Sequence, residues 1–270
     1  MRFIAILAML TLAWIPTAFG GSNVYLGQQK PQGSAVSFDQ INHKDFGALL
    51  ARYVTAKGEV DYRGWKKNKN DRQRLLNYLN HLSSGNPTLK SSRQATLAFW
   101  INAYNAVTIE GILQVYPTTS IRNHTAKLIG YNIWDDLQIH VGGKPYSLNQ
   151  IEHEILRPMK EPRIHFAIVC ASKGCPRLLN QAYTADRIHD QLELNSKNFF
   201  EQPQNAKLTG QTLALSSILD WFSEDFGDNP SEKLKTIRRW MPADMASGLA
   251  RAGKVKITYV DYDWSINEVR

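Results

Sequence analysis

The chain has 270 residues, of which 43% are hydrophobic and 21% are charged, a balance that excludes a protein disordered throughout. Its 32 Lys and Arg residues outnumber its 24 Asp and Glu residues, and the formal net charge of +8 makes nucleic acid and an anionic envelope surface candidate partners. Two cysteines are too few for a disulfide-scaffold protein.

The first 20 residues are predicted to be a secretory signal peptide, followed by a flexible leader at 21–36. Arg2 supplies the positive start, an apolar run occupies 3–15, and Ala18-Phe19-Gly20 matches a small-x-small cleavage site. The alternative is an uncleaved N-terminal anchor. The run is too short to span a bilayer and no later segment has 18 apolar residues, so no integral membrane segment is expected after cleavage.

Export to the periplasm or the medium changes the expected partners. Nucleic acid is no longer expected, and a disulfide is permitted in an oxidising compartment. Arg2 is the only charged residue in the predicted signal peptide, so the basic excess belongs to the folded part of the chain. This excess indicates attraction to an anionic envelope surface.

Apolar spacing predicts three helices in the first half of the chain. The first spans 42–57 and ends before Gly58, and the second contains four leucines between 75 and 82 and ends at 84–85. A short extended piece separates them at 60–62. The third and most apolar helix spans 93–115, with Ser91 or Ser92 as its N-cap.

The second half is predicted to alternate strands and helices. A hairpin at 135–148 turns at Gly142-Gly143, and a β-branched apolar run at 163–169 is typical of a buried strand. The remaining expected elements are helices at 147–156, 186–200, 216–226 and 231–240, a hairpin at 207–215 and a strand at 254–262. The predicted fold class is a single α+β domain over 37–270, with several helices packed on a mainly antiparallel sheet.

Two asparagines lie in the apolar third helix. Asn102 and Asn105 are three residues apart and share a helix face, so both amides are expected in the core. A buried amide without partners costs about 1–3 kcal/mol, so each needs specific hydrogen bonds. Either the amides tie neighbouring loops to the helix, or they line a pocket and bind substrate.

Both cysteines follow the predicted buried strand, at Cys170 and Cys175. A disulfide between them closes a loop of only six residues and would shape the turn more than stabilise the fold. Alternatively, Cys175 before Pro176 is a nucleophile with a histidine base, His165 or His153. A metal site that combines both cysteines with these histidines is a third interpretation, and two inert thiols are a fourth.

His153 and Arg157 are four residues apart on the helix predicted at 147–156. Cations at a helix C-terminus complement the helix dipole, so this pair is explained without function, although it could face an anionic group of a ligand. The polar and aromatic cluster at 261–267 is interpreted as a docked chain end with a minor role in pocket lining. The sequence contains no phosphate-binding glycine loop, zincin motif or serine-hydrolase elbow.

Four ordered blocks resemble the signature blocks of the family called domain of unknown function 547. They read FWINAYN at 99–105, SLNQIEH at 147–153, RIHFA at 163–167 followed by the two cysteines, and YDWSIN at 262–267. The resemblance extends over about 46–267 and implies an exported bacterial member of that family. It implies no activity. A weaker fold analogy is to papain and transglutaminase-like thiol enzymes, from which this chain departs by having Asn102 and no cysteine on its central helix.

Two hypotheses for function follow. The first is a thiol-dependent hydrolase or acyl transferase acting on an envelope peptide or glycan. Cys175 would be its nucleophile, His165 or His153 its base, and Asn102, Asn105, Arg157 and Cys170 would contact substrate. The second is a non-catalytic periplasmic ligand-binding or assembly module with a Cys170–Cys175 disulfide. Neither hypothesis requires a cofactor or a metal, and the C-x4-C spacing disfavours a thiol redox function.

Overall fold

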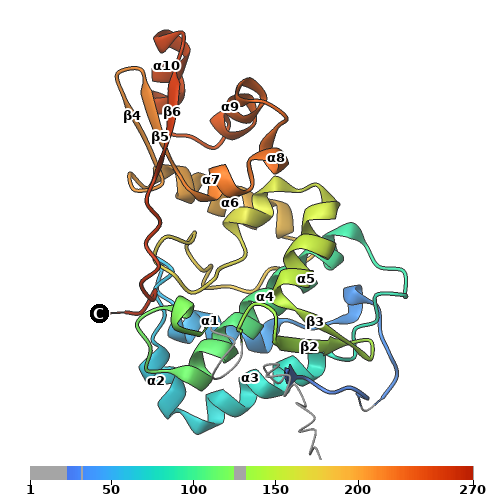
Figure 1. The fold of residues 1–270 in the computed structure, drawn as a ribbon. Coiled ribbons are helices and arrows are strands. Elements are labelled where there is room, and N and C mark those ends of the chain that lie inside the picture. Colours follow the sequence, from blue (N-terminus) through green and yellow to red (C-terminus); the bar gives the residue numbers. More distant parts are fainter. Residues whose placement is uncertain (1–22, 32, 125–131, 270) are drawn as a thin grey trace, which may run out of the picture.

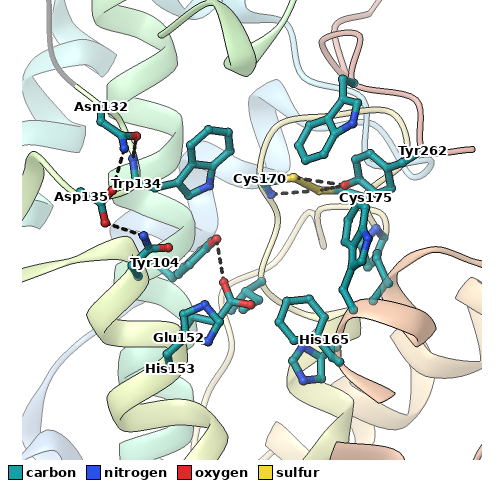
Figure 2. A pocket seen from close by; sticks show the side chains of 17 residues that line it. Tyr104, Asn132, Trp134, Asp135, Glu152, His153, His165, Cys170, Cys175 and Tyr262 are labelled. Carbon is teal, nitrogen blue, oxygen red and sulfur yellow. Dashed lines mark hydrogen bonds between the residues drawn. A yellow bond between two sulfur atoms is a disulfide. The ribbon is translucent and has the colours of Figure 1, made fainter. Parts of the chain in front are cut away.

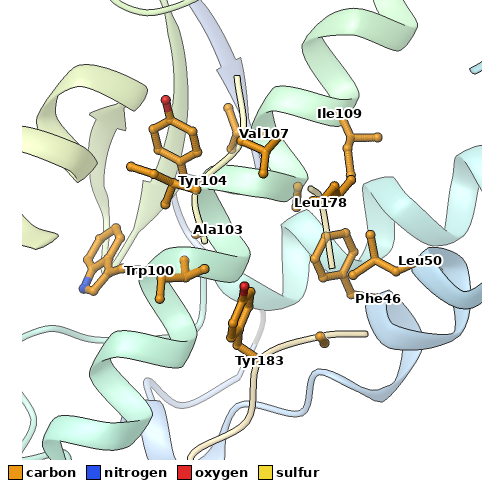
Figure 3. Packing of buried hydrophobic residues seen from close by; sticks show 14 of the residues in the cluster. Phe46, Leu50, Trp100, Ala103, Tyr104, Val107, Ile109, Leu178 and Tyr183 are labelled. Atoms are coloured by element: carbon orange, nitrogen blue, oxygen red, sulfur yellow. The ribbon is translucent and has the colours of Figure 1, made fainter. Parts of the chain in front are cut away.

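The long apolar helix α4 (Arg93–Val115) forms the centre of the fold in this computed structural model, which describes residues 23–31, 33–124 and 132–269. The predicted signal peptide lies outside these residues. α4 has the predicted bounds, and its N-cap is Ser92, whose side chain accepts a hydrogen bond from the Ala95 amide. Its side chains are buried on every side (Figure 3). Packed around it are α1 (Lys44–Tyr53), α2 (Tyr62–Lys67) and α3 (Lys69–Leu82).

The first sheet contains β1 (Val24–Leu26), β2 (Leu137–Val141) and β3 (Lys144–Ser147). β2 and β3 form the predicted antiparallel hairpin, and Gly142 and Gly143 in its turn have φ of 58° and 82°, as this turn geometry requires. β1 pairs with β2 in parallel. Regular structure at Val24–Leu26 differs from the irregular leader predicted for 21–36, because a three-residue strand carries no periodic signal.

The second sheet contains β4 (Ala206–Thr209), β5 (Thr212–Ser216) and β6 (Lys256–Val260). β4 and β5 are antiparallel, whereas β6 pairs with β5 in parallel. The fold is therefore α+β, but two three-stranded mixed sheets replace the expected mainly antiparallel sheet. The helices of this part are α6 (Ile188–Glu201), α7 (Ile218–Trp221), α8 (Ser223–Phe226), α9 (Pro230–Arg238) and α10 (Ala243–Ala252). Together with this sheet they enclose a second hydrophobic cluster (Figure 1).

The helix predicted at 147–156 changes its winding along its length. It begins as α5 (Leu148–Gln150), capped by reciprocal hydrogen bonds between Ser147 and Gln150. It continues as a π-helix, η3 (Ile151–Leu156), and ends in the 3₁₀ turn η4 (Arg157–Met159). A π-helix widens the turn and is found most often at functional sites.

The strand predicted at 163–169 is wrong. The chain forms a 3₁₀ helix, η5 (Pro162–Phe166), and then an irregular buried stretch. Its polar backbone atoms bond to side chains in place of a neighbouring strand: Asn105 accepts from the Val169 amide and donates to the Ala167 carbonyl, and Asn195 donates to the Phe166 carbonyl. Amide side chains satisfy the buried backbone here, so a sheet is not needed.

After β6 the chain returns across the molecule to the first hydrophobic cluster (Figure 1). Residues 261–269 form isolated bridges with three other segments, Ser172 to Ile266, Ser120 to Ser265 and Val60 to Glu268. Two 3₁₀ turns, η1 (Phe38–Gln40) and η2 (Ile121–His124), complete the described elements. None of the described helices is both long and apolar enough to cross a membrane.

Candidate functional site

A cavity of about 370 Å³ lies where the two hydrophobic clusters meet. Its wall includes side chains from α4, from the segment before β2, from η3, from the cysteine loop, from α7 and from the C-terminal segment. Figure 2 shows Asn132, Trp134 and Asp135 facing Cys170 and Tyr262 across this space.

Aromatic rings form much of the wall. Trp264 has its ring centroid 4.5 Å from that of Tyr262, 5.8 Å from that of Trp221 and 6.5 Å from that of Trp134. Trp221 at the rim is 49% exposed, unusually high for so large an apolar side chain. Three tryptophans and a tyrosine from three separate segments thus give the cavity flat apolar surfaces.

A cluster of planar polar side chains lies beside Trp134. The carboxylate of Asp135 accepts a hydrogen bond of 2.6 Å from the Asn132 amide and another from Asn149. All three residues line the cavity. They place hydrogen-bonding groups next to apolar rings, the combination typical of small-molecule sites.

Glu152 is a buried carboxyl group in the cavity wall, on the π-helix η3. Its hydrogen-bond partner in the described part of the chain is the Tyr104 hydroxyl, 3.2 Å from Oε2. Burial raises the pKa of Glu152 to about 7, against the smaller opposing effects of the Tyr104 hydrogen bond and of Arg157. The group therefore changes its charge near neutral pH.

His165 forms a charged network behind Glu152. Its Nε2 donates a hydrogen bond of 2.7 Å to Asp225, which also accepts one of 2.6 Å from Arg157. Although burial opposes it, these hydrogen bonds hold the pKa of Asp225 at about 2. Burial lowers the pKa of His165, although the hydrogen bond to Asp225 and the charge of Asp225 oppose this shift. Arg157 also donates to Nδ1 of His153 at 3.2 Å.

Cys170 and Cys175 form a disulfide that lines the cavity. The Tyr262 hydroxyl donates to the Cys175 sulfur at 2.9 Å. Between the cysteines, Ala171 has φ of 59°, a left-handed conformation that is costly for a residue with a side chain. With both sulfurs in the disulfide, neither is a thiolate nucleophile or a metal ligand in this state. The described residues contain no group of three or more His, Cys, Asp or Glu side chains arranged for a metal ion.

The structure brings four of the seven predicted site residues to the cavity: His153, His165, Cys170 and Cys175. Arg157 is not in its wall; it bonds to the wall residue His153 directly and is linked to His165 through Asp225.

Asn102 and Asn105, predicted as substrate-binding residues, do not line this cavity. Both are buried, and the backbone occupies their amides. Asn102 donates to the Tyr183 carbonyl and accepts from the Tyr183 amide, and Asn105 does the same for Ala167 and Val169. Their role is to fix two irregular segments to α4.

Sequence reasoning missed Glu152 and Asp225. Glu152 lies beside His153 in the block at 147–153, but its burial depends on the π turn, which has no recognised sequence pattern. Asp225 is 60 residues from His165 along the chain. Trp264 and Tyr262 were expected to be mainly structural, yet both line the cavity.

A family model described as "Protein of unknown function, DUF547" matches residues 88–200. Over these residues the chain is similar to the DUF547 family. The match is shorter than the expected 46–267, and the block at 262–267 lies outside it. No curated protein and no solved structure matches the chain.

The cavity is only partly a DUF547 feature. The matched residues supply Trp134, Glu152, both histidines and the disulfide, whereas Trp221, Tyr262 and Trp264 come from the chain after the match, as does Asp225, the partner of His165. Chemically, the site can stack planar groups, form hydrogen bonds with its amides and carboxyls, and give or take a proton at Glu152.

Proposed function

We propose that this protein is an exported envelope protein that binds an oligosaccharide in the aromatic cavity. The apolar run and small-x-small site of the first 20 residues favour export, and a disulfide is typical of proteins outside the reducing cytosol. The basic excess of the chain favours attraction to an anionic envelope surface.

The observation that carries the binding proposal is the meeting of Trp134, Trp221, Tyr262 and Trp264 around one cavity, beside Asp135 with its two amide partners. A sugar ring has apolar C–H faces and a rim of hydroxyls. Aromatic rings cover such faces, while amides and carboxylates bond to hydroxyls in their own plane. A bound peptide would be expected to form hydrogen bonds with backbone N–H and C=O groups of the protein. The polar groups described here in the cavity wall are side chains.

The disulfide favours binding over thiol-dependent hydrolysis or acyl transfer. A nucleophilic Cys175 needs a free thiolate, and in this state its sulfur is bonded to Cys170. The thiol hypothesis then requires a reductant in the envelope to open the disulfide before Cys175 can react. We therefore favour the non-catalytic ligand-binding hypothesis.

Calorimetric titration with a β-1,4-linked tetramer of N-acetylglucosamine tests this function. We expect saturable binding, with a change in tryptophan emission because three tryptophans line the cavity. Trp221→Ala should weaken binding by about tenfold, the loss of one aromatic stack of ~1.4 kcal/mol.

Tyr25→Ala is the matched control, because Tyr25 is similarly exposed, at 51%, and is outside the cavity wall. Its affinity should equal that of the unmodified protein. Binding of a soluble tetrapeptide in preference to the sugar, or equal affinities for the two variants, would contradict the proposal. Release of new reducing ends from the tetramer would contradict a non-catalytic role.

A further inference from the structure

Among the described residues, the side chains in the cavity wall include carboxyl groups and no Lys or Arg. The carboxyl groups are those of Asp135 and Glu152. The guanidinium of Arg157 is paired with Asp225 and Glu224, and that of Arg122 lies over the Trp264 ring, 5.3 Å from its centroid. An anionic ligand would bring its charge toward carboxylates that form no ion pair with a described residue, in a partly desolvated site, which is unfavourable.

Glu152 differs from Asp135 in its surroundings. Asp135 accepts hydrogen bonds from two amides, which stabilise a carboxylate, whereas the hydrogen-bond partner of buried Glu152 is one neutral phenol. Titratable or charged groups face Glu152 from each element packed near it. They are Tyr104 on α4, Arg157 on η4, His165 on η5, Asp225 on α8 and Tyr262 in the C-terminal segment.

The local backbone also sets Glu152 apart. It is the second residue of the π-helix η3, and its carbonyl accepts the hydrogen bond from the Arg157 amide that closes the π turn. π turns are rare and occur most often at functional sites, where they re-aim a side chain. The neighbouring Glu154 lies on the same π-helix but is exposed. The π-helical backbone by itself therefore does not account for the burial of Glu152.

We propose that Glu152 enters the ligand complex protonated and donates a hydrogen bond to an oxygen of an uncharged sugar, and that its ionised form makes the cavity reject acidic sugars. This inference rests on the oligosaccharide-binding function proposed above and names its ligand class. A protonated carboxyl has one O–H donor, and an acetamido carbonyl or a ring oxygen is the matching acceptor. Ionisation removes the donor and places a second negative charge in the cavity wall.

The raised pKa of Glu152 agrees with this role. Burial raises its pKa to about 7, so the protonated form predominates in mildly acidic solution and is lost above neutrality. Binding that needs the proton must weaken as pH rises through this value. In that range it must also take up a proton from solution.

The experiment measures the dissociation constant of the neutral N-acetylglucosamine tetramer and of an acidic galacturonic acid tetramer between pH 5.5 and 8.5. For the unmodified protein we expect the neutral tetramer to bind about tenfold more weakly at pH 8 than at pH 6, as a single group with a pKa near 7 dictates. The acidic tetramer should bind at least tenfold more weakly than the neutral one at pH 8.

Two variants separate Glu152 from its neighbour. Glu152→Gln keeps a hydrogen-bond donor and cannot ionise, so its affinity for the neutral tetramer should be independent of pH. Glu154→Gln should retain the pH dependence of the unmodified protein. Should Glu152→Gln fail to fold, calorimetry of the unmodified protein at pH 7.5 in buffers of different ionisation enthalpy still measures proton uptake, expected to be about three quarters of a proton per ligand.

Several results would overturn the inference: a pH-independent affinity in the unmodified protein, a pH dependence that survives in Glu152→Gln, equal affinity for both tetramers at pH 8, or no proton uptake. Each of these leaves the proposed binding function intact. Failure of the folded, unmodified protein to bind the neutral tetramer at any pH would overturn the binding function and this inference together.

Discussion

Buried polar side chains in this protein have two distinct fates. Asn102 and Asn105 each give one donor and one acceptor to backbone groups, so they are locked and serve the fold. Glu152 is also buried, but its partner is a single neutral hydroxyl and its carboxyl lines a cavity. A buried ionisable group with so few partners destabilises the folded state when it is charged. Such groups concentrate at functional sites.

Replacing Glu152 with Gln should therefore change how stability depends on pH. The folded-state pKa of about 7 lies above its ordinary value of 4.5, so the folded protein holds this proton more tightly than the unfolded chain does. The free energy of unfolding consequently falls as pH rises from about 4.5 to about 7. Glu152→Gln lacks this loss and should gain up to about 3 kcal/mol on the unmodified protein across that window.

Urea unfolding at pH 4.5, 5.5, 6.5 and 7.5 measures this difference. The exposed Glu154, changed to Gln, is the control and should follow the unmodified protein at every pH. If the free energies of unfolding of Glu152→Gln and the unmodified protein change with pH in parallel, burial does not raise the pKa of the Glu152 carboxyl.

At the scale of elements, the cysteine loop positions the aromatic wall. The Lys173 amide donates to the Ser265 carbonyl and the Gly174 amide to the Asp263 carbonyl, both at 2.8 Å. This pairing holds the C-terminal segment that contains Tyr262 and Trp264 against the loop. A Cβ added at Gly174 would lie 2.9 Å from both the Asp263 nitrogen and the Tyr262 ring. Only glycine allows so close an approach.

Gly174→Ala is expected to push the C-terminal segment away and disturb the cavity. Overpacking of this kind costs about 1–3 kcal/mol of stability, and displacement of the Tyr262 ring should weaken binding of the neutral tetramer. Gly47→Ala on α1 is a suitable control, because its added Cβ would meet Ala182 at an ordinary 3.6 Å. Equal tetramer affinity in the two variants would argue against a positioning role for the loop.

At the scale of the molecule, the cavity depends on two cores at once. α4 and η3 belong to the cluster around the first sheet, whereas α7 packs with the second sheet, and the C-terminal segment joins them. Cavities between packed units are common ligand sites because each unit presents its own face. The disulfide lies at this junction and is remote from the centre of either core.

Removing the disulfide should weaken the molecule without unfolding it. Cys170→Ser combined with Cys175→Ser opens a six-residue loop, for which chain entropy predicts a loss of ~2 kcal/mol. The far-ultraviolet circular dichroism spectrum should be retained, and the urea midpoint should fall. Loss of the native spectrum would instead make the disulfide essential for folding, and an unchanged midpoint would remove its stabilising role.

Sequence patterns were sufficient to predict the elements that are fixed by interactions between residues close together in the chain. The bounds of α4 follow from its capping serine and a continuous apolar run, and the first hairpin follows from two adjacent glycines that accept positive φ. Short elements carry too few residues for a period to be visible, so α2 and β1 were missed. The apolar run at 163–169 correctly predicted burial, but the same pattern cannot tell a strand from a segment held by the side chains of Asn105 and Asn195.

The sequence by itself determined the α+β class, the central helix, the DUF547 resemblance and the two cysteines that are close enough to pair. Only the tertiary structure decided which polar residues share a cavity. Asn102 and Asn105 lie outside it, because their amides bond to the backbone, whereas Glu152 and the C-terminal aromatic rings line it and Asp225 bonds to His165 in its wall. The physical reason is that burial and hydrogen-bond partners are set by segments far apart in the chain, such as Asp225 and His165, which no local pattern connects.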